Sequence, residues 1–122
     1  MRESVARHEA ELDALPESEP YKQGSPDQDF HFLIVRTSKN PLLIELLCLE
    51  LYPLLRVFRS PVKQSMERRH QSVLEHKRIL SAMEEGDSEL SEILMRRHIA
   101  AARRSREVLF PEAPPKAPKV TR

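Results

Sequence analysis

The sequence contains very little glycine and no tryptophan: of its 122 residues, two are glycine and none is tryptophan. Antiparallel sheet folds need frequent glycine-containing turns and strands rich in aromatic and β-branched residues, so the composition argues against an all-β fold. The same scarcity argues against a glycine-rich phosphate-binding loop, and neither GxGxxG nor GxxxxGK[ST] occurs. The 20 Lys and Arg nearly balance the 19 Asp and Glu. The whole chain therefore has no strong electrostatic attraction to nucleic acid.

A single cysteine, Cys48, excludes an intrachain disulfide and a cysteine-based zinc finger. It lies in an apolar run, where we interpret it as a buried thiol. Residues 1–15 lack the apolar core of a signal peptide. The most apolar stretch, residues 42–58, is interrupted by charged residues and by Pro53, which makes it a poor membrane span and favours a buried helix. We therefore expect a cytoplasmic protein without membrane segments.

Proline residues divide the chain into helical segments. We predict helices over about residues 2–15, 26–38 and 41–59, the last capped by Asn40 and kinked at Pro53. A helical hairpin follows, over about residues 62–85 and 88–109. Gly86 suits a left-handed helix C-cap, and Asp87 suits the N-cap of the next helix. Short connections make neighbouring helices antiparallel, so the expected fold class is all-α, an antiparallel helical bundle.

This division predicts three regions. Residues 1–25 form an N-terminal helix and a polar connector, residues 26–110 form the helical bundle, and residues 111–122 form a proline-rich disordered tail.

The histidines are the residues best suited to bind a metal ion. Asp27 and His31 are four residues apart and lie on one face of a predicted helix. His76 and His98 each lie within an apolar stripe with a spacing of three and four residues. The stripes are Val73, His76, Leu80 and Met83 in one helix, and Leu90, Leu94, His98 and Ala101 in the other. Three histidines and one carboxylate, on three helices, therefore face the core.

A shared metal ion would satisfy these inward groups together. Each buried neutral imidazole needs a donor and an acceptor, and three of them in a small core are costly. Taken singly, each histidine is more simply explained by a role in the core or on the surface. One divalent cation would satisfy all three and neutralise the carboxylate. We therefore predict a metal site formed by Asp27, His31, His76 and His98.

The remaining reactive groups predict no second site. His8 and His70 lie outside the inward pattern, and Glu67 and His70 form a single Glu-x-x-His that we interpret as a solvated helix face. The arginines at positions 96–106 have no interleaved aromatic residues, so we interpret them as an exposed face of the last helix. No Ser/His/Asp or Cys/His arrangement can be assembled, and we predict no enzymatic activity.

Three segments of the chain carry a family resemblance. Residues 27–31 (DQDFH) with 38–43 (SKNPLL), residues 75–87 (EHKRILSAMEEGD) and residues 95–99 (MRRHI) follow in this order. They resemble the D-x-x-F-H…S-x-N-P-L-L, E-H-x-x-I-L-x-A-I-x-x-G-D and M-x-x-H-I motifs of FCD domains. These are the effector-binding C-terminal domains of the FadR subfamily of GntR transcription regulators. The resemblance covers about residues 26–106.

The resemblance implies an antiparallel all-α bundle with a divalent metal, often zinc or nickel. Carried over residue by residue, the family's ligands fall on Asp27, His31, His76 and His98. The implied effector is a small carboxylate such as a sugar acid, an organic acid or an amino acid. Two alternatives remain open: a small helical metalloenzyme that uses the same ligands, and a helical interaction module in which the histidines are vestigial.

The chain also departs from the family pattern at its N-terminus. A full FCD domain begins with one or two more helices, and nothing before Asp27 resembles the winged helix-turn-helix of a GntR regulator. We therefore expect a bundle that is incomplete at the N-terminus, with DNA binding only through a winged helix-turn-helix that this chain lacks. Missing helices would leave one flank of the apolar segment 42–58 uncovered, which predicts a homodimer or other self-association.

Overall fold

The computed structural model describes residues 1–14, 30–51, 53–54 and 65–107, and this part of the chain contains helices and no strand. The helices are α1 (Arg2–Ala14), α2 (Phe30–Thr37), α3 (Pro41–Leu43), the π-helix η2 (Ile44–Leu51), α5 (Met66–Glu84) and α6 (Ser88–Glu107). The all-α prediction is therefore confirmed. Several predicted helical residues and the predicted proline-rich tail, residues 111–122, lie outside the described residues. These helical residues are 15, 26–29, 52, 55–59, 62–64, 108 and 109.

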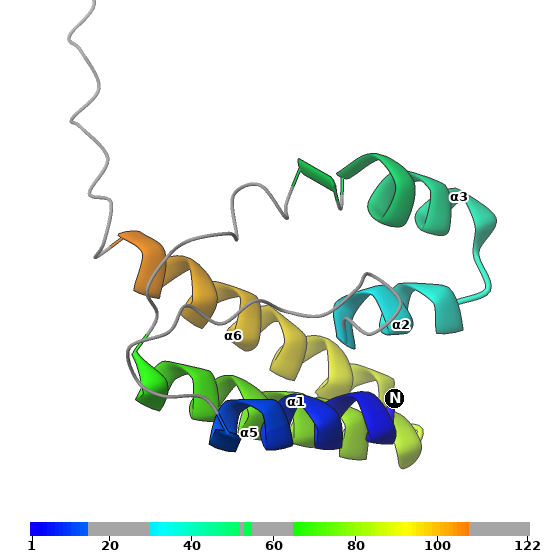
Figure 1. Cartoon of the computed structure of the whole chain (residues 1–122). Coiled ribbons are helices and arrows are strands. Elements are labelled where there is room, and N and C mark those ends of the chain that lie inside the picture. Colours follow the sequence, from blue (N-terminus) through cyan, green and yellow to red (C-terminus); the bar gives the residue numbers. More distant parts are fainter. Residues whose placement is uncertain (15–29, 52, 55–64, 108–122) are drawn as a thin grey trace, which may run out of the picture.

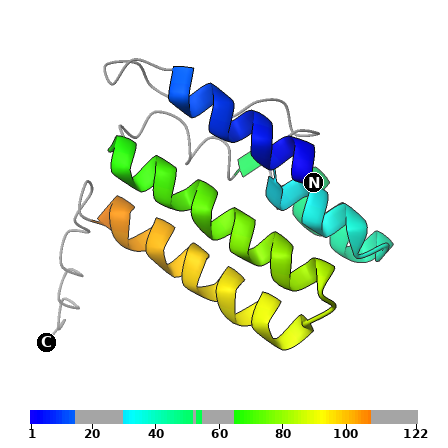
Figure 2. The ribbon, with the colours of Figure 1, turned by 90° about the horizontal axis from the view of Figure 1, so that it is seen from below.

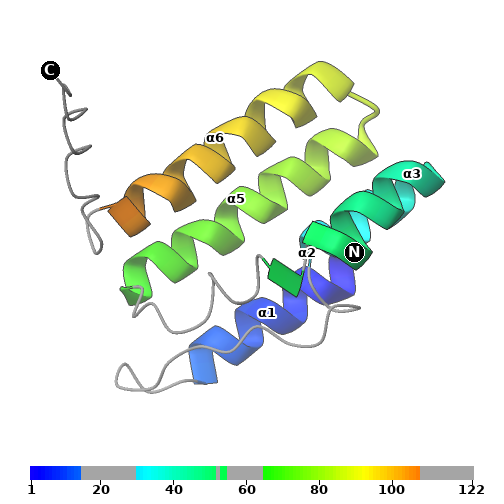
Figure 3. The ribbon, with the colours of Figure 1, turned by 90° about the horizontal axis from the view of Figure 1, so that it is seen from above.

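The helices form one layer of three with a helical pair beside it. Helices α1, α5 and α6 lie side by side, with α5 in the middle (Figures 2 and 3). Helix α2 lies close to one end of this layer, and η2 packs against α2 on the side away from α6 (Figure 1). The apolar core is formed where α1, α2, α5 and α6 meet. Its buried members are Val5, Phe30, Val73, Ile79 and Leu80.

The turn between α5 and α6 follows directly from its two central residues. Gly86 has a φ of +74°, the left-handed conformation that glycine adopts without a steric penalty. Its N–H donates to the Met83 carbonyl at 3.1 Å, and the N–H of Asp87 donates to the Ala82 carbonyl at 3.0 Å. These two bonds form a Schellman motif. The Asp87 carboxylate then accepts from the N–H of Leu90 at 2.9 Å and caps α6, so both predicted capping roles are confirmed.

The apolar segment that begins at Pro41 differs from the predicted single helix. Asn40 caps its start as predicted, accepting from the N–H groups of Leu42 and Leu43 at 3.1 and 3.2 Å. Beyond Leu43 the helix widens to the π-form, which sequence patterns did not indicate. The widened part ends at Leu51, two residues before Pro53, whose ring and missing N–H oppose helix continuation.

Most of this segment is exposed in the described structure. Cys48 is buried, as predicted for its thiol. By contrast, six leucines of the segment expose between 41% and 68% of their surface and Leu47 is half-buried, so the expectation of a buried helix was wrong for this part of the chain. The physical reason is that, among the described helices, the segment makes its main contacts outside itself with α2, which covers only one of its flanks. The exposed leucines are Leu42, Leu43, Leu46, Leu49, Leu51 and Leu54.

None of the described helices combines the length and the apolar character needed to cross a membrane.

The positive φ of Gly86 generates a stability prediction. We expect Gly86→Ala to lower the free energy of unfolding by about 1 kcal/mol, because a left-handed conformation is strained for alanine. An added Cβ would meet no atom within 4 Å, so backbone strain accounts for the loss. Gly86→Asn is the matched control and should lose less, since asparagine tolerates this conformation. Urea unfolding followed by circular dichroism measures both, and equal stability of all three proteins would contradict the prediction.

The exposed leucines predict self-association. Leu42 and Leu49 expose 62% and 68% of their surface, and a group of exposed apolar side chains of this kind promotes association in water. We expect oligomers at micromolar concentrations and a shift toward the monomer in Leu42→Lys/Leu49→Lys. Leu74→Lys, at an exposed leucine on α5, is the control. Light scattering coupled to size-exclusion chromatography measures the mass, and a stable monomer of the unmodified chain would contradict the expectation.

Candidate metal centre

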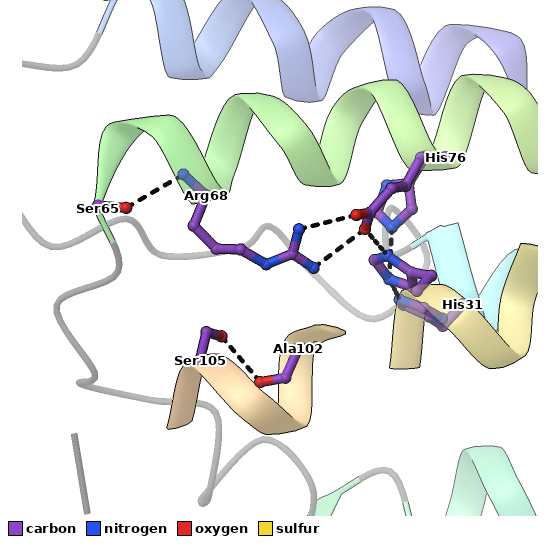
Figure 4. Close-up of polar contacts among 8 residues, drawn as sticks. His31, Ser65, Arg68, His76, Ala102 and Ser105 are labelled. Carbon is purple, nitrogen blue, oxygen red and sulfur yellow. Dashed lines mark hydrogen bonds and ion pairs between the residues drawn. The ribbon is translucent and has the colours of Figure 1, made fainter. Parts of the chain in front are cut away.

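Three of the four residues proposed from the sequence lie together in the structure. His31 on α2, His76 on α5 and His98 on α6 each offer a ring nitrogen to one cluster, in which the three nitrogens lie within 4.8 Å of one another. Figure 4 labels His31 and His76 in this cluster. The Nε2 atom of His98 lies 3.2 Å from the Nε2 atom of His76 and 3.2 Å from that of His31. Asp27, the fourth predicted ligand, lies outside the described residues.

Each histidine reaches this point because of the helix that carries it. His76 and His98 face the core from α5 and α6 and expose only 2% and 4% of their surface. His31 follows Phe30 in the first turn of α2. The Phe30 ring stacks on the His76 ring, with the ring centroids 4.3 Å apart, and the His31 ring stacks on His98 at 5.1 Å. The Phe-His dipeptide therefore anchors α2 on the α5–α6 hairpin through two ring contacts.

The separations of the His98 Nε2 atom from the other two Nε2 atoms are compatible with a single metal ion. Zinc binds imidazole nitrogen at roughly 2.0–2.1 Å, so two such nitrogens on one ion lie about 2.8–3.0 Å apart at octahedral angles and about 3.3–3.4 Å apart at tetrahedral angles. The two separations of 3.2 Å lie between these values. Hydrogen bonding alone explains the cluster less well. His98 Nε2 carries either one lone pair or one hydrogen in its ring plane and cannot make a full hydrogen bond to both neighbours.

Two residues that sequence reasoning did not assign to the site support His98 from its other side. The Nδ1 atom of His98 lies 2.6 Å from the Glu75 Oε2 atom. Both terminal guanidinium nitrogens of Arg68 donate to the Glu75 carboxylate, at 3.0 Å each. Burial raises the pKa of Glu75, but the hydrogen bonds from Arg68 and His98 outweigh burial and hold that pKa below its usual value. The carboxylate is therefore ionised and accepts the Nδ1–H of His98.

The other two histidines have different surroundings. His8 on α1 is half-buried, and its ring centroid lies 5.8 Å from that of His76, so it lies closer to the cluster than the sequence pattern indicated. The weak amphipathic pattern of α1 gave no signal for this. His70 is exposed, as predicted for a solvated helix face. Its ring nitrogens contact the Met66 carbonyl at 2.9 Å and the Asp13 carboxylate at 3.1 Å.

Comparison with known proteins places this chain in a family. Residues 1–101 match the family model of the FCD domain, which belongs to transcription regulators. The chain therefore belongs to the FCD family, and the resemblance seen in the sequence motifs is confirmed. The match extends upstream of those motifs and includes α1. No curated protein and no solved structure matches the chain.

The contacts of His70 predict a pH dependence that is independent of the cluster. Its hydrogen bond to the Met66 carbonyl, and then its contact with Asp13, raise the pKa of His70 above the ordinary value of about 6.5. Because the pKa is higher in the folded state than in the unfolded state, protonated His70 stabilises the fold. This stabilisation is fully present below about pH 6.5 and is lost as the pH rises through the folded-state pKa.

We expect NMR titration to place the pKa of His70 above its ordinary value and Asp13→Asn to lower it. Glu92→Gln, on the exposed face of α6, is the control and should leave it unchanged. An unchanged His70 pKa in Asp13→Asn would contradict the conclusion that Asp13 helps to raise it.

Proposed function

We propose that the chain is the effector-binding module of a transcription regulator of the FadR subfamily, with one divalent cation in its site. The observation that carries the proposal is the convergence of the Nε2 atoms of His31, His76 and His98 from three helices. Imidazole nitrogen suits Zn²⁺ and Ni²⁺. Asp27 is the proposed fourth ligand, because it precedes His31 by one helical turn in the sequence.

The charge of such a centre favours an anionic effector. Three neutral imidazoles and one carboxylate around a divalent ion leave a net charge of about +1. When bound, a cation that accepts five or six ligands would supply a Lewis-acid centre with positions beyond the four protein ligands. A small carboxylate that fills such a position would gain direct coordination and cancel the residual charge. Effector recognition of this kind needs no chemical step, so we propose a binding module and no enzyme.

We further propose a cytoplasmic homodimer. The exposed leucines of α3 and η2 support association, and the FCD domain is a domain of regulators that dimerise. Contact with DNA would require a winged helix-turn-helix in addition to the helices described above.

Metal analysis tests the proposed site. We expect protein purified without an affinity tag to hold about one Zn²⁺ or Ni²⁺ per chain, and His76→Ala and His98→Ala to hold little. His70→Ala removes an exposed histidine outside the cluster and is the matched control. Because both cluster histidines are buried, circular dichroism must show that the variants remain helical, and His76→Gln provides a milder replacement.

The metal should also be lost as the pH falls through about 6.5, because protonated imidazole cannot bind a cation. Equal metal content in the unmodified protein and in the two cluster variants would contradict the site. Absence of metal from the unmodified protein at neutral pH would favour the interaction module with vestigial histidines.

Calorimetry then tests the effector part of the same proposal. Candidate sugar acids, organic acids and amino acids are titrated into metal-loaded and metal-stripped protein. We expect binding to the loaded protein and a large loss of affinity in the stripped one. Equal affinity of the effector for both forms would show that effector binding does not require the metal.

A further inference from the structure

The consecutive residues Glu75 and His76 contact both ring nitrogens of His98. Glu75 Oε2 lies 2.6 Å from His98 Nδ1, and His76 Nε2 lies 3.2 Å from His98 Nε2. His98 comes from α6, whereas the two residues that contact it come from α5. His76 is thus a member of the histidine cluster, whereas its neighbour Glu75 contacts the His98 ring on the side that faces away from the cluster.

Arg68 holds this carboxylate in place. It lies seven residues before Glu75, which is two helical turns along the same face of α5. Its two terminal nitrogens bond the two oxygens of Glu75 at 3.0 Å each, and Figure 4 shows its side chain extending along α5 toward the histidines. The two side chains expose only 14% and 17% of their surface. A bidentate pair of this kind fixes the plane of the carboxylate as well as its position.

The carboxylate determines which nitrogen of His98 can bind a cation. An ionised carboxylate only accepts hydrogen bonds, so His98 Nδ1 must carry the hydrogen in this contact. In the neutral ring the lone pair is then on Nε2, the nitrogen that faces His31 and His76. The opposite tautomer would place a hydrogen on Nε2, where it would block coordination.

We propose that Arg68 and Glu75 are positioning residues that hold His98 in the tautomer and ring orientation required to bind a cation through Nε2. The inference rests on the proposed metal-binding function, and it adds two residues that act through His98 without touching the cation. Outer partners of this kind typically change metal affinity by about 10- to 100-fold.

The decisive variant removes the pair without leaving a buried charge. Replacing one member alone would leave its partner ionised and poorly paired, whereas exchanging both for apolar residues of similar size is often tolerated. We therefore choose Arg68→Met/Glu75→Met, with circular dichroism as the check of folding. The matched control is Arg96→Met/Glu92→Met, which removes an exposed Arg–Glu pair on α6 with a bond of 2.9 Å. Glu75→Gln removes the charge and keeps an oxygen that can accept the same hydrogen bond.

Two measurements are made on each protein. Nitrogen-15 NMR of the metal-free protein, at a pH where the ring is neutral, reports which nitrogen of His98 carries the hydrogen. Competition with a chromogenic chelator reports the affinity for Zn²⁺. We expect the Nδ1–H form in the unmodified protein and in the control. In Arg68→Met/Glu75→Met we expect a substantial Nε2–H population and an affinity lower by about 10- to 100-fold. Glu75→Gln should retain the tautomer and show a smaller loss of affinity.

The outcomes separate this inference from the proposed function. An Nδ1–H form that persists in the folded double variant would overturn the positioning role, whatever the metal affinity. A changed tautomer with unchanged Zn²⁺ affinity would overturn it as well. An unmodified protein that binds no Zn²⁺, but whose His98 tautomer still depends on the pair, would overturn the proposed metal function and support the positioning of His98.

Discussion

Three imidazole rings impose the strongest constraint on this small helical fold, because the Nε2 atom of His98 lies 3.2 Å from the Nε2 atoms of both His31 and His76. Two of them, His76 and His98, are almost completely buried, and a buried polar ring without suitable partners destabilises the folded state by several kcal/mol. Helices α2, α5 and α6 must therefore meet with their histidines in register. The stacking of Phe30 on His76 shows how an apolar contact and the polar cluster are formed by the same two helices.

The register between His76 and His98 is determined by the turn that joins their helices. His76 lies ten residues before Gly86, and His98 lies eleven residues after Asp87. In an antiparallel hairpin with a tight Schellman turn, residues at nearly equal distances from the turn lie side by side. The left-handed Gly86 and the capping Asp87 thus bring His76 and His98 side by side, although the two histidines are over twenty residues apart in the chain.

The parts of the fold and site that could be predicted are those governed by local rules. Helical spacing turned His31, His76 and His98 inward, and capping preferences located the turn at Gly86. Contacts between helices were beyond such rules. Glu75 and Arg68 carry the charges typical of a solvated face, and only the approach of α6 makes them partners of His98. The exposure of the leucines after Pro41 likewise depends on which helices pack against them, which apolar periodicity does not report.

The stability of helix α2 depends on its contacts with the histidine cluster, and the cluster in turn needs His31 from α2. The described part of α2, Phe30–Thr37, has eight residues, which alone are too few for a stable helix in water, so packing must stabilise this part. The first residues of α2 supply that packing, because Phe30 and His31 contact His76 and His98 on the hairpin. A ligand that binds only when all three rings are together stabilises that arrangement by mass action. In the proposed metal-bound form, occupancy of the cluster would therefore hold α2 against α5 and α6. Metal binding would then be coupled to the packing of the segment that continues through Asn40 into the exposed apolar face of α3 and η2.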